Sequence, residues 1–276
     1  MKLDLHVHTT YSDGQYSPEQ VVDLAVKNKL DGIAITDHDG IKGIYKAVKR
    51  SSIYNGFLVI PGIEFSCDYN GEEVHILGYY IDYKSDELAG ILNMLNEERI
   101  KRGQKIIYEL NKIGLEISID DVKKYSNNGF IGRPHIAQAI VEKEYAEDIK
   151  DAFNRYLIEG RPGYVKRYKL SIVKTIRLIR KLGGVAVLAH PGLLKDNKAI
   201  SYSIDNGIDG IEAIHSKHSS SDTERFINIA KDNSLIATGG SDFHGGKFSD
   251  DNSLGKYYVD ISPIEMLKRR HKLDSI

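Results

Sequence analysis

The chain has 276 residues, 41% hydrophobic and 28% charged, which suits one large α/β domain or a barrel with an insertion. Its 38 basic and 39 acidic residues give a net charge of -1, so no global positive field is available to hold long nucleic acid non-specifically. The single cysteine, Cys67, excludes an internal disulfide and fits a reducing compartment. The polar N-terminus and the lack of a long apolar run predict a cytoplasmic protein with no signal peptide or membrane span.

Strands and helices alternate over the N-terminal third. Residues 3–7 alternate apolar and polar side chains, as a strand does. Ser17, Pro18 and Gln20 together predict a helix start, with an N-cap, a proline at the first helical position and a capping-box partner. We also expect a helix at 41–50 and strands at 32–36, 57–60 and 74–81.

The middle of the chain is helical in pattern and poor in strand signals. Helices are predicted at 86–114, 134–143 and 148–158. We therefore expect residues 91–167 to form an inserted helical cap, and residues 1–90 and 168–276 to form the domain that it interrupts.

The C-terminal third returns to alternation, with a helix from Ser171 to 182 and strands at 184–189, 210–214 and 235–238. The segments KLDGIAIT, GIDGIEAI and KLGGVAVLAH each read as a helix end, a glycine and an apolar strand, and such repeated units predict parallel strands. A closed or nearly closed β/α barrel is the leading architecture, and an open doubly wound sheet is the alternative. No Gly-x-Gly-x-x-Gly loop follows the first strand, which disfavours a dinucleotide site.

Histidines and carboxylates gather at or near the predicted strand ends. The set is His6, His8, Asp13, His38, Glu64, His75, His190, Asp242 and His244. In a β/α barrel the C-terminal ends of the strands converge on one face, so these side chains can share one site. So many imidazoles and carboxylates need a cation to compensate them. Four further histidines fit no ligand pattern: His135, His215, His218 and His271.

The His6-Val7-His8 spacing has a geometric meaning, because alternate strand residues face the same side. Both imidazoles can then approach one metal while Val7 enters the core. Mixed nitrogen and oxygen ligands favour divalent Zn, Mn or Fe over Mg or Ca. The absence of a cysteine ligand disfavours a structural zinc site.

The motifs DLHVHTTYSDG, AITDHDG, GIEFS, VHILGY, LAHP and GGSDFHG resemble, in this order, those of the PHP (polymerase and histidinol phosphatase) family of metal-dependent phosphoesterases. The resemblance spans nearly the whole chain. It is strongest to the branch of nucleoside 3',5'-bisphosphate phosphatases and 5'-3' oligoribonucleases. The segments IGRPHIAQAIV and YLIEGRPGYV resemble the inserted helical cap of that branch. It implies a distorted seven-stranded β/α barrel that binds two or three divalent metal ions.

The resemblance also implies how the ligands divide. One ion would take His6, His8, Glu64 and Asp242. A second would share Glu64 and add His75 and His190. A third would take Asp13, His38 and His244. The catalytic set is then Glu64, Asp13, His38 and Asp242, and a metal-bound hydroxide would hydrolyse the phosphoester. Asp37 and His218 are candidate general acids, although the preferred role for Asp37 is to orient a ligand imidazole.

Substrate contacts are expected in the cap. The predicted residues are Arg99, Arg102, Arg133 and His135, because arginine forks suit terminal phosphates and the related branch has arginines at corresponding places. The substrates implied are nucleoside 3',5'-bisphosphates or short 5'-phosphorylated RNA, and neither long duplex nucleic acid nor a membrane is an expected partner. The alternatives are a histidinol-phosphate phosphatase, an amidohydrolase and a non-catalytic PHP module.

Overall fold

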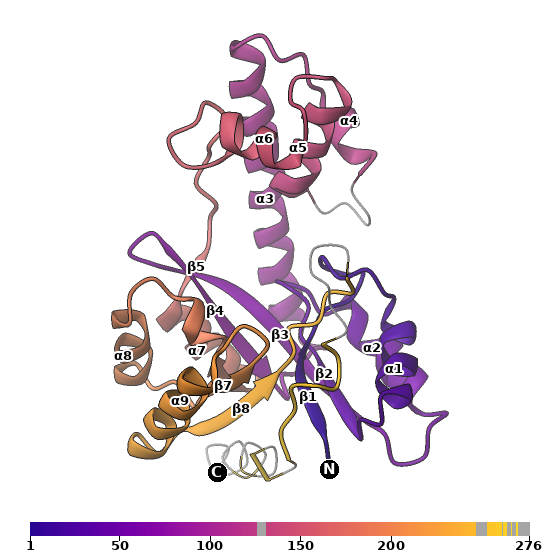
Figure 1. Cartoon of the computed structure of the whole chain (residues 1–276), viewed down its shortest axis with the longest axis vertical. Coiled ribbons are helices and arrows are strands. Elements are labelled where there is room, and N and C mark those ends of the chain that lie inside the picture. The colour runs from indigo at the N-terminus through magenta and orange to yellow at the C-terminus, as the bar shows by residue number, and fades with distance from the viewer. Residues whose placement is uncertain (126–130, 247–252, 261, 264–265, 267–268, 270–276) are drawn as a thin grey trace. The chain divides into compact units, whose positions relative to one another are not determined.

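A computed structural model describes residues 1–125, 131–246, 253–260, 262–263, 266 and 269. The chain divides into two units (Figure 1). Unit 1 consists of Met1–Ala89 and Lys169–Ile276, and unit 2 is the continuous segment Gly90–Tyr168. None of the described helices is both long enough and apolar enough to cross a bilayer.

Unit 1 is built on one strongly curved sheet. Its strands are β1 (Leu3–Val7), β2 (Gly32–Ile35), β3 (Leu58–Tyr69), β4 (Glu72–Tyr79), β5 (Leu170–Ser171), β6 (Val185–Leu188), β7 (Gly210–His215) and β8 (Ile236–Gly240). They follow the order β1-β2-β3-β4-β6-β7-β8, and the short β5 pairs with β3. Just beyond β8, the Phe243 carbonyl accepts a hydrogen bond of 3.0 Å from the His8 N–H of the segment that continues β1. The seven-strand path is therefore a nearly closed barrel, as predicted, and the doubly wound alternative is wrong.

The helices of unit 1 surround this sheet (Figure 1). They are α1 (Pro18–Lys27), α2 (Lys42–Ser51), α7 (Ile172–Lys181), the 3-10 turn η2 (Pro191–Leu193), α8 (Lys198–Asp205) and α9 (Ser220–Asp232). The predicted capping box is confirmed, because Ser17 and Gln20 exchange side-chain-to-backbone hydrogen bonds at the start of α1. Val7 packs with α1 and α2, and His6 and His8 approach Glu64 instead. The predicted division of this strand into two faces is therefore confirmed.

The three repeated segments contain β2, β6 and β7, and the pairings β1–β2, β2–β3 and β6–β7 are parallel, as predicted. Antiparallel β4 lies between β3 and β6, so the sheet is mixed. One expectation is wrong, because β3 continues well past Glu64, which therefore lies inside a strand and not after it. The turn Asn70-Gly71, with φ of 50° and 90°, joins β3 and β4 as a tight hairpin. Within that hairpin Ser66 pairs with His75 and Glu64 with Leu77, which puts Glu64 and His75 on the same face.

Unit 2 is helical in the part that the structure describes. It contains most of α3 (Asp86–Lys112), then α4 (Ile119–Lys123), α5 (Arg133–Glu142), α6 (Ile149–Ala152) and the π-helix η1 (Phe153–Leu157). The three helices predicted at 86–114, 134–143 and 148–158 are present as α3, α5 and the pair α6 and η1. The short α4 was not predicted. Apolar side chains from these helices form a separate core that includes Leu110, Val122, Ile136, Ile140 and Leu157. Unit 2 thus has its own hydrophobic core.

Candidate metal centre

The nine predicted ligands all lie in unit 1, where local pairing brings them together. The backbone of Glu64 also pairs with that of His38, which follows β2, in an isolated parallel β-bridge. Four sets of side chains hold their ligand atoms within 4.8 Å of one another. These sets are His8, Asp13, His38 and His244; His6, His8 and Glu64; His38, Glu64 and His75; and His6, Glu212 and His215.

The buried carboxylate of Glu64 is shared between two groups of histidines. Its Oε1 atom lies 2.8 Å from His75 Nδ1 and 3.1 Å from His190 Nε2. Its Oε2 atom lies 2.8 Å from His38 Nδ1 and 3.3 Å from His8 Nε2. The two oxygens of this carboxylate therefore each face their own pair of imidazoles.

Asp242 completes the set around the first pair of histidines. Its Oδ1 atom lies 3.1 Å from His8 Nε2 and 3.4 Å from His6 Nε2. His6 Nε2 in turn lies 3.4 Å from Glu64 Oε2. These are the four side chains that the family resemblance assigns to one ion.

Asp13 lies at the outer edge of the cluster and is half exposed. Its Oδ1 atom is 3.1 Å from His244 Nε2, and its Oδ2 atom is 3.7 Å from His38 Nε2. The rings of His8 and His244 stack with centroids 4.1 Å apart. The three residues assigned to the third ion therefore also lie together.

Several buried ligand atoms of the cluster lie close to one another but form no well-aligned hydrogen bond among the described residues. They are His6 Nε2, His8 Nε2, His38 Nδ1 and Glu64 Oε2. An unsatisfied buried polar atom costs about 1–3 kcal/mol, so four that converge would be unfavourable in the protein alone. Divalent cations bound at the sets that contain these atoms would satisfy them, which means that the donors present fit metal ions.

The electrostatics of the metal-free site also favour a cation. Burial disfavours charge on His75, but Glu64 and Glu73 outweigh this and raise the pKa of His75 to about 10. In the same way burial opposes charge on His244, yet Asp13 and Asp242 raise its pKa to about 9. The carboxylates therefore hold protons on these rings, which bound metal would displace.

The backbone is strained at two of the ligands. His190 has φ of 26° and Asp242 has φ of 55°, in the left-handed region that residues with a Cβ rarely adopt. Such strain persists where the surrounding structure over-determines it, and functional sites are where it gathers. The backbones of β8 and β1 approach each other closely at Gly240 and His6. A Cβ on Gly240 would lie 2.5 Å from the His6 backbone nitrogen, so a larger residue there would displace this ligand.

Asp37 contacts the loop that carries Asp13. Its buried carboxylate accepts hydrogen bonds from the Thr9 N–H at 2.7 Å, the Thr9 hydroxyl at 2.8 Å and the Ser12 hydroxyl at 2.7 Å. Ser12 Oγ is also 3.4 Å from His8 Nδ1. These contacts favour the orienting role over that of a general acid, because Asp37 reaches His8 through Ser12.

His218 has both ring nitrogens engaged. Its Nδ1 lies 3.0 Å from the Ala213 carbonyl, to which it donates, and its Nε2 accepts from the Gly192 N–H at 3.1 Å. Burial lowers the pKa of His218, which disfavours the charged ring further. The geometry thus describes a neutral structural histidine, and the general-acid hypothesis for His218 loses support.

Two side chains that sequence reasoning missed lie against the cluster. Glu212 is fully buried in β7, with Oε1 3.1 Å from His6 Nδ1. His215, at the end of the same strand, has Nε2 3.5 Å from Asp242 Oδ2. The one available signal was a carboxylate within the apolar strand GIEAI, followed by a histidine at the strand's end.

The four predicted substrate contacts all lie in unit 2. Arg99 is largely buried on α3, and Arg102 Nε donates to the Val165 carbonyl at 2.7 Å. Arg133, at the start of α5, lies over the Phe153 ring. His135 Nδ1 accepts from the Gly132 N–H at 3.2 Å, which caps α5. Their role in binding substrate stays a prediction.

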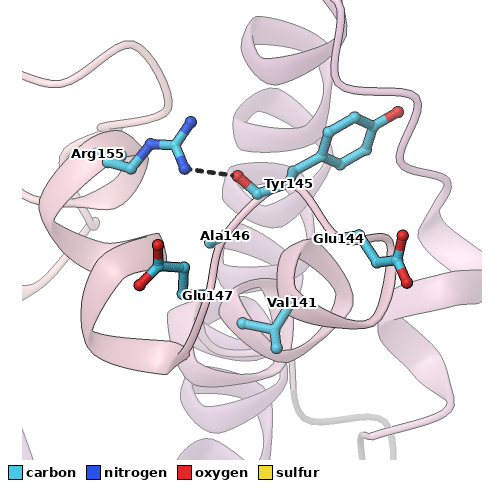
Figure 2. A pocket seen from close by; sticks show the side chains of 6 residues that line it. All are labelled: Val141, Glu144, Tyr145, Ala146, Glu147 and Arg155. Carbon is cyan, nitrogen blue, oxygen red and sulfur yellow. Dashed lines mark hydrogen bonds between the residues drawn. The ribbon is translucent and has the colours of Figure 1, made fainter.

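Unit 2 also has a surface pocket of about 360 Å³ (Figure 2). Its lining is Val141, Glu144, Tyr145, Ala146, Glu147 and Arg155. Arg155 donates to the Tyr145 carbonyl at 2.9 Å across this pocket. The lining includes none of the predicted metal ligands or substrate contacts.

Comparison with known proteins places the chain among phosphoesterases. The PHP domain family matches residues 4–183. The chain is 33% identical over 249 residues to the 5'-3' exoribonuclease Rnm of Salmonella typhimurium, covering 87% of this chain and 84% of that protein. It is 32% identical over 249 residues to the 3',5'-nucleoside bisphosphate phosphatase of Chromobacterium violaceum, covering 88% and 87%.

The fold comparison agrees. A crystal structure of a protein from Bifidobacterium adolescentis, assigned as a metal-dependent phosphoesterase, superposes with a TM-score of 0.82 at 30% identity. The match covers 97% of this chain and 96% of that one. The shared architecture therefore extends over nearly the full length of both chains.

Proposed function

The chain belongs to the PHP family, and from this premise we propose that it is a metal-dependent phosphoesterase that acts on small phosphorylated nucleotides. The observation that carries the proposal is the placement of Glu64, whose two carboxylate oxygens face different histidines at 2.8 Å each. A bridging carboxylate of this kind suits a cluster of ions around an anionic phosphate.

We propose two or three divalent ions, with Mn, Zn or Fe as the candidates. The nine ligands named from the sequence would hold them, with Glu64 shared. When bound, such ions neutralise phosphate oxygens and lower the pKa of water. The chain's own contribution is to fix the ligands: the β3–β4 hairpin holds Glu64 beside His75, and the contacts of Asp37 fix the loop of Asp13.

Unit 2 would recognise the rest of the substrate. The support is chemical: Arg99, Arg102 and Arg133 belong to one unit, and guanidinium groups bind terminal phosphates with paired hydrogen bonds. Two relatives are named for a nucleoside bisphosphate and for RNA cleavage from the 5' end. Both substrates present a second phosphate that an arginine could hold while another phosphoester is hydrolysed.

The test uses the purified full-length chain. After chelation and removal of the chelator, we expect no hydrolysis of a nucleoside 3',5'-bisphosphate or of a 5'-phosphorylated RNA hexamer. Added Mn should restore activity toward one or both, and the ratio of the two rates decides between phosphatase and exonuclease. Undiminished hydrolysis in excess chelator, or none with Mn, Zn or Fe on either substrate, would refute the proposal.

A further inference from the structure

Glu212 contacts two metal-ligand residues at once. Its two carboxylate oxygens lie 3.1 and 3.2 Å from His6 Nδ1. Oε2 also accepts a hydrogen bond of 2.7 Å from the backbone N–H of His190. Because a carboxylate can only accept, His6 carries a proton on Nδ1, and in the neutral ring that a metal requires its Nε2 then has the lone pair, on the side of Glu64 and Asp242.

The same hydrogen bond holds the His190 backbone at φ of 26°. That conformation is unfavourable for a residue with a Cβ, so it needs support from its surroundings. A single buried carboxylate therefore fixes the ring of His6 and the main chain of His190, which belong to different proposed ions.

His215 has the corresponding relation to Asp242. Its Nδ1 accepts from the Lys217 N–H at 3.1 Å, so the proton of a neutral ring lies on Nε2. That atom is 3.5 Å from Asp242 Oδ2, the oxygen opposite the one that faces His6 and His8. Oδ1 is thus left to a metal, while Oδ2 lies beside the ring of His215 at a distance longer than a usual hydrogen bond.

A bulge in β7 allows both side chains to act on the same site. Residues three apart on a regular strand face opposite sides. Here the pairing with β8 skips one residue, since Glu212 pairs with Thr238 and Ile214 with the next residue, Gly239. The extra residue, Ala213, returns His215 to the face of Glu212.

We propose that Glu212 and His215 are positioning residues of the metal centre, with Glu212 setting the tautomer of His6 and the backbone of His190, and His215 orienting Asp242. The proposal rests on the proposed metal centre and adds to its nine ligands a second layer supplied by one strand. The set His6, Glu212 and His215 is then support for the centre, although its ligand atoms lie close enough together for a further ion.

The test measures metal binding by the apoprotein, independently of turnover. Mn is titrated into chelator-treated wild type and Glu212→Gln by calorimetry. The amide keeps the shape but removes the charge that makes His6 a better ligand. We expect the affinity of at least one ion to fall roughly 10- to 100-fold, the range typical for such outer partners.

Asp209→Asn is the matched control. Asp209 is another buried carboxylate and lies directly before β7. It accepts a hydrogen bond of 3.0 Å from the Ala186 N–H and forms an ion pair with Arg180. Its loss should lower the thermal stability of the apoprotein without changing Mn affinity. If Asp209→Asn weakens Mn binding as much as Glu212→Gln does, general destabilisation explains both and the inference is wrong.

A second pair of variants covers the case in which Glu212→Gln does not fold. His215→Gln keeps an N–H near the position of Nε2, and His215→Ala removes it. We expect the glutamine to retain most of the Mn affinity and the alanine to lose roughly 10-fold or more. Equal affinities for both variants, or wild-type affinity in a folded Glu212→Gln, would overturn the inference alone. A wild type that binds no Mn, Zn or Fe would overturn the proposed centre itself.

Discussion

At the scale of single residues, the chemistry depends on how one side chain is shared. Glu64 is completely buried, and the histidines around it outweigh the effect of burial and hold its pKa well below the usual range. It is therefore an anion at neutral pH. Histidines lie on both sides of this charge, so it can serve two cations at once.

Glu64→Gln tests this directly. The amide has the same shape but no charge, so we expect the metal content to fall by at least one ion per chain. Hydrolysis should fall by more than the 10- to 100-fold typical of outer partners. Elemental analysis and phosphate release measure the two effects. Glu87→Gln, which removes only the exposed ion pair with Lys181, should change neither. A fully loaded and active Glu64→Gln would contradict the bridge.

Arg133 tests the role of unit 2. Each lost charged hydrogen bond costs about 1.5–3 kcal/mol, so Arg133→Ala should lower kcat/KM for a nucleoside bisphosphate roughly 10- to 100-fold. Slow hydrolysis of an aryl phosphate, which lacks the second phosphate, should barely change. Arg155→Ala is the control, because Arg155 also lies in unit 2 but pairs with Asp151 and the Tyr145 carbonyl. Equal losses on both substrates would place the effect of Arg133 in folding or at the metals.

At the scale of elements, β1 joins distant parts of unit 1 through Asp4. Asp4 Oδ1 accepts from the Ser241 N–H at 2.8 Å and from the His6 N–H at 3.3 Å. Oδ2 accepts from the Gly255 N–H at 3.4 Å. One buried carboxylate thus connects the first strand, the segment after β8 and a segment near the C-terminus.

Asp4→Asn should destabilise the protein by about 1–3 kcal/mol, because its amide directs N–H groups at a backbone donor. Burial raises the pKa of Asp4 to about 7, against backbone donors that favour the ionised form. The pKa of Asp4 is higher in the folded than in the unfolded protein, so the protonated carboxyl favours folding. The free energy of unfolding of the wild type therefore decreases as the pH rises from about 4 to 7. The difference between wild type and Asp4→Asn should therefore be smaller at pH 8 than at pH 5.

Urea unfolding of the apoproteins at the two pH values measures this. Asp31→Asn is the control, since Asp31 also accepts a backbone N–H, from Lys2 at 2.7 Å, but is exposed. It should change stability by less than about 0.5 kcal/mol. A gap for Asp4→Asn that widens toward pH 8 would show that the ionised carboxylate is the stabilising form.

The elements also mark the limit of what the sequence could predict. Alternation along residues 3–8 was enough to place His6 and His8 on one face, because a strand's period is local. The position of Glu64 within β3 was not predictable in this way, since the strand runs on into a hairpin with β4. Glu212 and His215 were missed for a related reason. The bulge that aligns them depends on pairing with β8, and a single strand's sequence does not contain it.

At the scale of the whole molecule, protons and metals compete for the same site. The pKa of His75 is raised to about 10 and that of His244 to about 9, so both rings are protonated in the metal-free protein at pH 7. Metal binding requires neutral imidazoles and must release these protons. Apparent metal affinity should therefore increase as pH rises from 6.5 to 8.

Calorimetry of Mn binding at pH 7 in two buffers with different ionisation enthalpies counts the protons. We expect more than one to be released per chain when the centre fills. A binding enthalpy that is the same in both buffers would mean that no proton leaves. In that case the histidines would already be neutral before metal arrives.

Unit 2 is inserted into unit 1, and this order has a consequence for synthesis. The ribosome completes His6, His8, Asp13, His38, Glu64 and His75 first, then all of unit 2, and only afterwards His190, Asp242 and His244. At usual elongation rates the delay is on the order of ten seconds. A nascent or truncated chain that ends within unit 2 therefore lacks ligands from each of the three proposed ion sets. The full set of proposed ligands therefore exists only after His244 has been added to the chain.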